Sequence, residues 1–260
     1  MLRSVLAMTA ALFLAAGAQG AVVTKAVEYE HDGAKLKGFV AYDDAVKEKR
    51  PGVLVVHEWW GLDDYAKMRA EMLAKMGYVA FACDMYGDGK VAAHPEDAGK
   101  MATMVRQNLD VWRGRAKESL KQLTDFELTD AKRCAAIGYC FGGSTCIQLA
   151  ASGADLKAVA TFHAALPKLK PEEAKAIKAK VLVCHGADDK FIPAQAIADF
   201  KKALADGHVS LDFQEYPGAV HSFTVKGADD RKLDGMKYNK DADEKSWAAM
   251  TKLFEETLKK

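Results

Sequence analysis

The chain has 260 residues, half of them apolar, so it can bury a sizeable core as one α/β domain or two small ones. Thirty-seven Lys and Arg residues against 36 Asp and Glu residues leave a formal net charge of +1. A balance this close to neutral creates no broad field that would attract nucleic acid or an anionic membrane. We therefore expect an ordinary soluble globular protein without a nucleic-acid partner.

Residues 1–20 have the three parts of a cleaved secretory signal peptide. Arg3 supplies a positive start, Val5 to Ala16 form an uncharged apolar run, and Ala18-Gln19-Gly20 offer small residues at a cleavage site. The run is shorter than the roughly 20 residues that a transmembrane helix needs, so no stable membrane association is expected. The interpretation predicts a secreted or periplasmic protein whose mature part is 21–260; a buried N-terminal helix is the alternative.

The mature part alternates predicted strands and helices. A hairpin joins Ala26–Glu30 to Leu36–Tyr42 around a His-Asp-Gly turn. The elements expected after it are a strand at Gly52–His57, a helix at Asp63–Met76, strands at Tyr78–Asp84 and Ala135–Tyr139, a helix at Gly143–Ala151, strands at Ala158–Phe162 and Val181–His185, a helix at Pro193–Asp206 and a strand at Ser210–Tyr216. This order predicts a mostly parallel wound sheet with helices on both faces, in one domain.

Two helical regions complete the pattern. Glu96–Leu123 is long enough for two helices, with a break expected near Gly114. A closing helix from about Asp243 carries a row of apolar side chains on one face: Trp247, Met250, Phe254 and Leu258. We expect that row to pack against the sheet.

Five cysteines lie in the predicted mature chain, and an odd number leaves at least one thiol unpaired in an oxidising compartment. Their spacing contains no C-x-x-C pair, which gives no support to zinc binding or thioredoxin-type chemistry, and we expect neither a metal nor a cofactor. Cys83, Cys134, Cys146 and Cys184 are read as small buried hydrophobic residues, with any disulfide pairing among them left open.

Cys140 differs because of its neighbours in Gly138-Tyr139-Cys140-Phe141-Gly142-Gly143. The stretch links a predicted strand to a predicted helix, as in a nucleophile elbow. Such an elbow needs small residues two before and two after the nucleophile so that strand and helix can cross closely. It also points the next backbone N–H, here that of Phe141, toward a bound carbonyl. A glycine-rich turn around a core cysteine is the alternative.

Candidate partners for Cys140 follow in the chain order of α/β-hydrolases, nucleophile then acid then histidine. Asp189 comes after the strand Val181–His185, and His221 comes after the strand Ser210–Tyr216. Both positions lie at the carboxyl ends of strands, where wound sheets place their ligands. Asp188 remains a one-residue alternative to Asp189.

These three motifs resemble those of the dienelactone hydrolase family over nearly the whole mature chain. The resemblance rests on the cysteine elbow, on Asp189-Lys190-Phe191-Ile192-Pro193 and on His221-Ser222-Phe223. It implies an α/β-hydrolase fold and a Cys140–His221–Asp189 triad. It also implies carboxymethylenebutenolidase-like hydrolysis of a small-molecule ester or lactone through a thioester, in an exported bacterial member.

A fourth match is Glu58, where the family has a glutamate that contacts the resting cysteine. A carboxylate beside a thiol disfavours the thiolate, so Glu58 is expected to keep Cys140 neutral until substrate arrives. An acid at the start of the next helix is the alternative reading. The N–H of Trp59 is the candidate second oxyanion donor. The rings of Trp59 and Trp60 fit either the pocket mouth or the core.

The substrate is where the resemblance ends. The founding members hold a substrate carboxylate with two arginines, and Asp88 and Val225 stand at those positions here. Neither side chain can replace a bidentate guanidinium, although Lys90 or Lys226 would offer point charges. Tyr86, Asp88 and Trp60 are candidate pocket residues. An amide or peptide hydrolase and a non-catalytic binding module remain rival functions, and we expect a monomer or small homo-oligomer.

Overall fold

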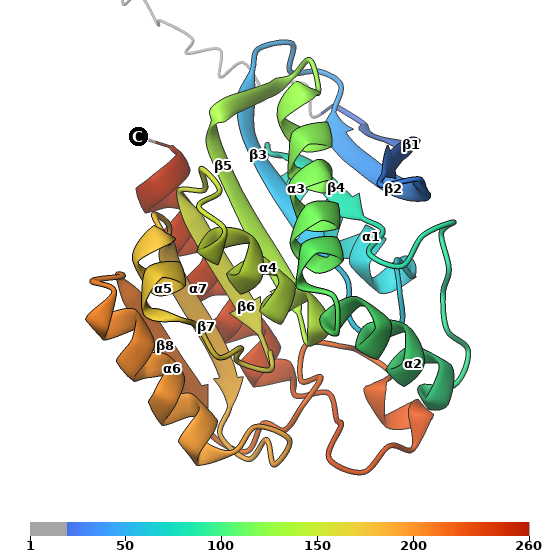
Figure 1. Cartoon of the computed structure of the whole chain (residues 1–260). Helices are drawn as coiled ribbons and strands as arrows, with labels where there is room; N and C mark the ends of the chain where they lie inside the picture. Colours follow the sequence, from blue (N-terminus) through green and yellow to red (C-terminus); the bar gives the residue numbers. More distant parts are fainter. Residues whose placement is uncertain (1–19, 260) are drawn as a thin grey trace, which may run out of the picture.

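The computed structural model describes residues 20–259, so all but the last residue of the predicted signal segment 1–20 lies outside the described residues. An eight-stranded sheet with the order β1-β2-β4-β3-β5-β6-β7-β8 crosses the molecule (Figure 1). Its strands are β1 (Val22–His31), β2 (Ala34–Asp43), β3 (Arg50–Val56), β4 (Val79–Cys83), β5 (Thr129–Tyr139), β6 (Ala158–Phe162), β7 (Lys180–Gly186) and β8 (Leu211–Tyr216).

The sheet is mostly parallel. The β1–β2 and β2–β4 pairs are antiparallel, and every later pair from β4–β3 to β7–β8 is parallel. Strands β3, β4 and β6 are buried along their whole length, as expected for central strands covered on both faces. Because these strands run the same way, their carboxyl ends meet at one edge, where the loops that carry the candidate site residues begin.

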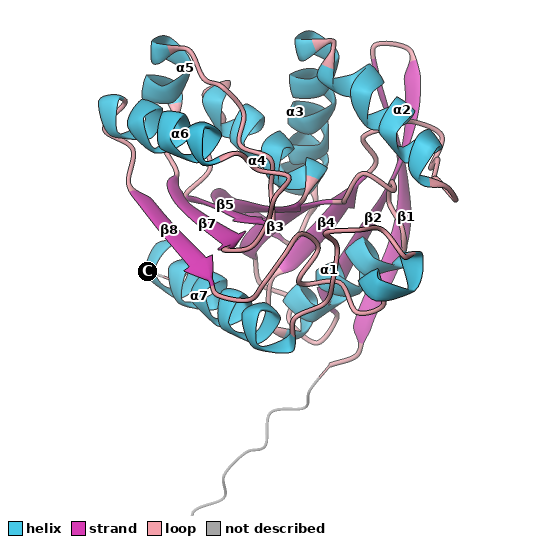
Figure 2. Cartoon of the chain, turned by 90° about the horizontal axis from the view of Figure 1, so that it is seen from below, coloured by secondary structure: helices cyan, strands magenta, loops and turns pink. Residues whose placement is uncertain are grey.

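Helices cover both faces of the sheet (Figure 2). One face carries α2 (Pro95–Arg106), α3 (Leu109–Asp125), α4 (Phe141–Ala151), α5 (Pro171–Ala176) and α6 (Ala194–Asp206). The other carries α1 (Asp64–Lys75) and α7 (Lys240–Leu258), and a short 3-10 turn, η1 (Ala228–Arg231), precedes α7. Each face has its own apolar core, and Met250, Phe254 and Leu258 bring the predicted row of α7 into one of them.

The predicted break near Gly114 is wrong. The helices separate at Gln107 and Asn108, and Gly114 lies inside α3. Asn108 caps α3 because its side-chain oxygen accepts a hydrogen bond from the N–H of Val111, which satisfies one of the unpaired donors of the first turn. Gly114 instead permits close packing, since a Cβ there would meet the His31 ring.

Other element boundaries differ from the predicted ones because of specific strand pairs and hydrogen bonds. Strand β5 begins at Thr129, six residues before the predicted start, because Thr129 and Asp130 pair with Arg50 and Pro51 across a bulge. Helix α7 begins at Lys240, where Asn239 accepts a hydrogen bond from the N–H of Ala242. Neither α5 nor η1 was predicted, because a single or broken turn is too short to show a helical period.

Among residues 20–259, no helix is both long and apolar enough to cross a membrane. Within the same residues, no group of three or more His, Cys, Asp or Glu side chains is arranged to hold a metal ion.

The close crossing of β5 and α4 makes the stability of the fold sensitive to a side chain at Gly138. A Cβ at Gly138 would lie 2.1 Å from the carbonyl oxygen of Gly142, a backbone atom that cannot turn away. We expect Gly138→Ala to lower the free energy of unfolding by about 1–3 kcal/mol through overpacking. Gly99→Ala is the matched control, since it lies inside α2 and its Cβ would meet only Trp59 at 3.9 Å. It should raise stability by about 0.5–1 kcal/mol. Urea unfolding midpoints check both, and a neutral Gly138→Ala would contradict this description of the crossing.

Candidate active site

Cys140 occupies a strained elbow between β5 and α4. Its φ of 51° lies in the left-handed region, which non-glycine residues rarely adopt, and its side chain is buried. The flanking glycines make the crossing possible, because a Cβ at Gly142 would lie 2.2 Å from the carbonyl oxygen of Val56. The N–H of Cys140 donates to the carbonyl of Phe162 on β6, which fixes the turn against the neighbouring strand.

The structure brings His221 and Asp189 together. Nδ1 of His221 lies 2.8 Å from Oδ2 of Asp189, and both side chains are almost fully buried. The second carboxylate oxygen of Asp189 accepts from the N–H of Phe191 at 2.9 Å, which orients the group. Asp188 is exposed to solvent, so of the two adjacent acids it is Asp189 that contacts the histidine.

The side chain of Cys140 lies beside the ring of His221. Burial lowers the pKa of His221, whereas an ionised Cys140 and the hydrogen bond with Asp189 raise it, so the histidine holds a proton once the thiol has given one up. Since Nδ1 is taken by Asp189, Nε2 is the nitrogen left to face the sulfur. The pairing of His221 with Asp189 therefore leaves one ring nitrogen available to Cys140.

Glu58 follows β3 and is buried in the same cluster. Its Oε1 accepts a hydrogen bond of 2.9 Å from the hydroxyl of Ser222, the residue after His221. Within the described residues, it is this hydroxyl and not the thiol of Cys140 that hydrogen-bonds to Glu58. Burial raises the pKa of Glu58 to about 7, against the opposing effects of His221 and Ser222. A carboxyl with this pKa changes its charge near neutral pH.

Two backbone amides at the elbow are free to bind an oxyanion. Neither the N–H of Phe141, at the start of α4, nor the N–H of Trp59 has a hydrogen-bond acceptor among residues 20–259. The Trp59 segment is held from both sides, because the hydroxyl of Tyr86 donates to the carbonyl of Trp59 and Nδ1 of His57 lies 2.5 Å from the carbonyl of Glu58. A fixed pair of free donors is the arrangement that stabilises a tetrahedral intermediate.

The predicted pocket residues have different surroundings. Trp60 is buried in a small cluster with Ala92 and Ala98, so its ring belongs to the packing. Tyr86 is buried with its ring edge against His57. Asp88 is exposed to solvent and has a φ of 56°, and Val225 is buried. Neither side chain can bind a substrate carboxylate as an arginine would.

Sequence reasoning missed two guanidinium groups near the site. Arg231, from η1, stacks 3.6 Å from the centre of the Trp60 ring, and its charge lowers the pKa of Glu58. Arg106, from α2, lies 5.2 Å from the centre of the Phe141 ring. Their surroundings in the sequence are ordinary helical and loop residues, so no local motif marks them. Ser222 was quoted in a motif but given no role.

All five cysteines are buried free thiols.

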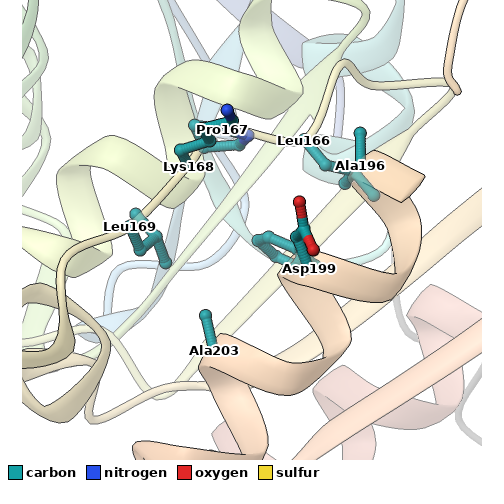
Figure 3. Close-up of a pocket in the computed structure, with 8 residues that line it drawn as sticks. Leu166, Pro167, Lys168, Leu169, Ala196, Asp199 and Ala203 are labelled. Carbon is teal, nitrogen blue, oxygen red and sulfur yellow. The ribbon is translucent and has the colours of Figure 1, made fainter.

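A hollow of about 440 Å³ beside the site is lined by Phe191, Val220 and residues of the 229–237 loop. The ring of Phe191 stands edge-on to that of His221. A second hollow of about 240 Å³ lies between the loop after β6 and α6, with Lys168 and Asp199 in its lining (Figure 3). No residue of the elbow lines it.

Comparison with known proteins identifies the family and the fold. Residues 36–258 match the Dienelactone hydrolase family. The chain is 30% identical to a putative carboxymethylenebutenolidase of Aquifex aeolicus, over 78% of this chain and 88% of that one. It is 31% identical, with the same coverage, to a protein named usf from Aquifex pyrophilus.

Two solved structures share the whole architecture. The chain named m3DLH is 38% identical with a TM-score of 0.90, covering 92% of this chain and 100% of its own. P91, described as a dienelactone hydrolase-like promiscuous phosphotriesterase from metagenomic libraries, is 36% identical with the same TM-score and coverage. The expected α/β-hydrolase fold is therefore confirmed, and the chain belongs to the dienelactone hydrolase family of ester and lactone hydrolases.

Proposed function

We propose that this protein hydrolyses a small-molecule ester or lactone through Cys140 and a thioester intermediate. The observation that carries the proposal is the strained, glycine-flanked elbow at Cys140, together with the buried His221–Asp189 pair. Strained backbone at a buried nucleophile persists only where the surrounding structure holds it, and it gathers at active sites. A core cysteine without chemistry would need neither the strain nor the histidine.

The first half of the reaction forms the thioester. His221 takes the proton of Cys140 on Nε2, and the sulfur attacks the carbonyl carbon of the substrate. The carbonyl oxygen becomes an oxyanion held by the N–H groups of Phe141 and Trp59. When the intermediate collapses, the alcohol leaves with the proton from His221, and the acyl group stays on sulfur.

Water completes the cycle. His221, oriented by Asp189, removes a proton from a water molecule that attacks the thioester. The acid product leaves, and Cys140 regains its proton. Because a thiolate leaves a tetrahedral intermediate more readily than an amine does, the mechanism favours activated esters and lactones over amides.

In the proposed resting state, Glu58 keeps Cys140 protonated. Two negative charges side by side in a buried site oppose each other, so a carboxylate near the sulfur disfavours the thiolate. A neutral thiol is also less open to oxidation than a thiolate. This protection suits the exported location that residues 1–20 predict, and export stays part of the proposal.

Replacing the nucleophile tests the central claim. Cys140→Ala should lower kcat/KM for p-nitrophenyl acetate by about a thousandfold or more, because the covalent route is lost. Mass spectrometry of the unaltered protein during turnover should find the acetyl group on Cys140. Cys146→Ala, another buried thiol on α4, is the matched control and should keep activity within a few-fold. Unchanged hydrolysis by Cys140→Ala would refute the mechanism, and faster cleavage of p-nitroanilides than of esters would favour an amide hydrolase.

The adjacent acids allow a matched test of the histidine's partner. Asp189→Asn removes a carboxylate that raises the pKa of His221, so that pKa should fall, whereas exposed Asp188→Asn should leave it nearly unchanged. We expect kcat/KM to drop about 100- to 10,000-fold in Asp189→Asn only. NMR titration of the His221 ring and steady-state kinetics give the two readouts. Equal effects of the two substitutions would contradict the assignment.

The role of Glu58 is tested without substrate. Removing a like charge near a thiol favours the reactive thiolate form. Glu58→Gln should therefore speed iodoacetamide alkylation of Cys140 about tenfold at pH 7. In Glu58→Gln, the part of the pH dependence of the alkylation rate that reflects titration of Glu58 near pH 7 should disappear. Rates are followed by mass spectrometry of the Cys140 peptide. A rate equal to that of the unaltered protein would show that Glu58 does not restrain the thiol.

A further inference from the structure

His163 presents a buried ring nitrogen to Glu58, the residue proposed to restrain Cys140. Its Nδ1 has no hydrogen-bond partner among the described residues and lies 3.7 Å from Oε1 of Glu58. The imidazole is fully buried, at the end of β6, and its backbone has a φ of 41°. An unpaired buried polar group and a strained backbone both destabilise the fold. Their coincidence at one residue beside Glu58 indicates a function for it.

A chain of three hydrogen bonds that starts at the Arg69 guanidinium determines which ring nitrogen of His163 carries the proton. Nε of Arg69 donates to the hydroxyl of Tyr65 at 3.2 Å, and a guanidinium can only donate. The hydrogen of Tyr65 is then directed to Oγ1 of Thr224, at 2.6 Å. The hydrogen of Thr224 is in turn directed to Nε2 of His163, at 2.7 Å.

A neutral imidazole that accepts at Nε2 carries its hydrogen on Nδ1. His163 is neutral because burial and the nearby charges of His221 and Arg69 hold its pKa well below the usual range. Arg69 is itself anchored, since its guanidinium donates to Asp243 at 2.6 Å and to the carbonyl of Thr224 at 2.8 Å. The relay from Arg69 therefore leaves an N–H group on His163 aimed at Glu58.

We propose that the Nδ1–H of His163 and the hydroxyl of Ser222 form a receiver that holds the Glu58 carboxylate away from Cys140 during catalysis. The proposal rests on the restraining role of Glu58 proposed above and makes His163 a positioning residue. In the structure Ser222 already holds Oε1, and a shift of under about 1 Å would bring Nδ1–H within hydrogen-bonding distance. With the carboxylate held there, Cys140 can pass its proton to His221.

Charged and titratable groups face both Glu58 and His163. Glu58 is faced by His221, Asp63 and Arg231. His163 is faced by His221 and Arg69, with the ring of Phe223 packed edge-on against it. His163 is the neutral donor in this group, so it can stabilise the carboxylate without adding a positive charge beside the His221 imidazolium.

Three substitutions at His163 separate the effect of the proposed N–H group from the effect of the ring's shape. His163→Phe keeps an aromatic ring for packing but has no donor. His163→Asn keeps a donor near the position of Nδ1, because the amide nitrogen stands at the same number of bonds from the backbone. His163→Gln, whose amide reaches toward Thr224, serves as a second variant without the donor. Each is made with Glu58 intact and with Glu58→Gln, and urea unfolding checks that it folds.

We expect His163→Phe and His163→Gln to slow Cys140 alkylation by about tenfold or more, the usual effect of losing a hydrogen bond to a buried charge. The alkylation profile should move to higher pH, and kcat for p-nitrophenyl acetate should fall with little change in KM. His163→Asn should stay within about threefold of the unaltered protein. In the Glu58→Gln background, all three should have no further effect on alkylation, because no carboxylate remains to be held.

The outcomes distinguish the two proposals. A loss in His163→Phe that persists unchanged in the Glu58→Gln background would overturn the receiver alone. Normal alkylation in both His163→Phe and His163→Gln would do the same. Normal alkylation in Glu58→Gln by itself would overturn the restraint and the receiver together, while the assignment of Cys140 as nucleophile would stand on its acyl adduct.

Discussion

The close approach of α4 to the ends of β3 and β5 is the constraint on which the rest of the site depends. Only a residue without a side chain fits at Gly142, whose Cβ would collide with the carbonyl oxygen of Val56. That same carbonyl ends β3, and Glu58 follows two residues later. Glu58 and Trp59 directly follow β3, so the contact that packs α4 against the end of β3 places them at the same edge of the sheet as Cys140. The groups proposed as nucleophile, oxyanion donors and restraining acid therefore depend on the same packing contact.

Burial then decides how the charges of the site behave. Glu58, Asp189 and His221 are all nearly inaccessible to water, so each charge is felt strongly by its neighbours. Desolvation pushes the carboxyl of Glu58 toward its neutral form and keeps His163 neutral, whereas the partners of His221 favour its charged form. Adjacent groups are thus held in different protonation states, as separate acid, base and donor roles require. No metal is needed in the proposed reaction to create this difference.

The sequence predicted the alternation of elements well, because buried strands and strand-end loops leave local signals. Cys140, Glu58, Asp189 and His221 could be named as candidates from local motifs, and the structure places Asp189 and not Asp188 against His221. The break between α2 and α3 was misplaced because glycine was read as a helix breaker, although Asn108 is the better helix cap. Contacts between distant segments were invisible. His163, Thr224, Tyr65 and Arg69 come from four separate parts of the chain, and no periodicity joins them.

The arrangement also separates chemistry from substrate recognition. The reacting groups stand on strand ends and a rigid elbow, whereas Phe191 and the 229–237 loop line the neighbouring hollow. Loops can change without disturbing the strands that carry a nucleophile, which is how one fold supports many substrates. Here Asp88 and Val225 replace the two arginines that the family resemblance implies, and guanidiniums approach instead from α2 and η1, at Arg106 and Arg231. In the proposed mechanism the hydrolytic groups do not depend on those two positions, so loss of the carboxylate clamp would change which ester binds and would leave the groups proposed to cleave it in place.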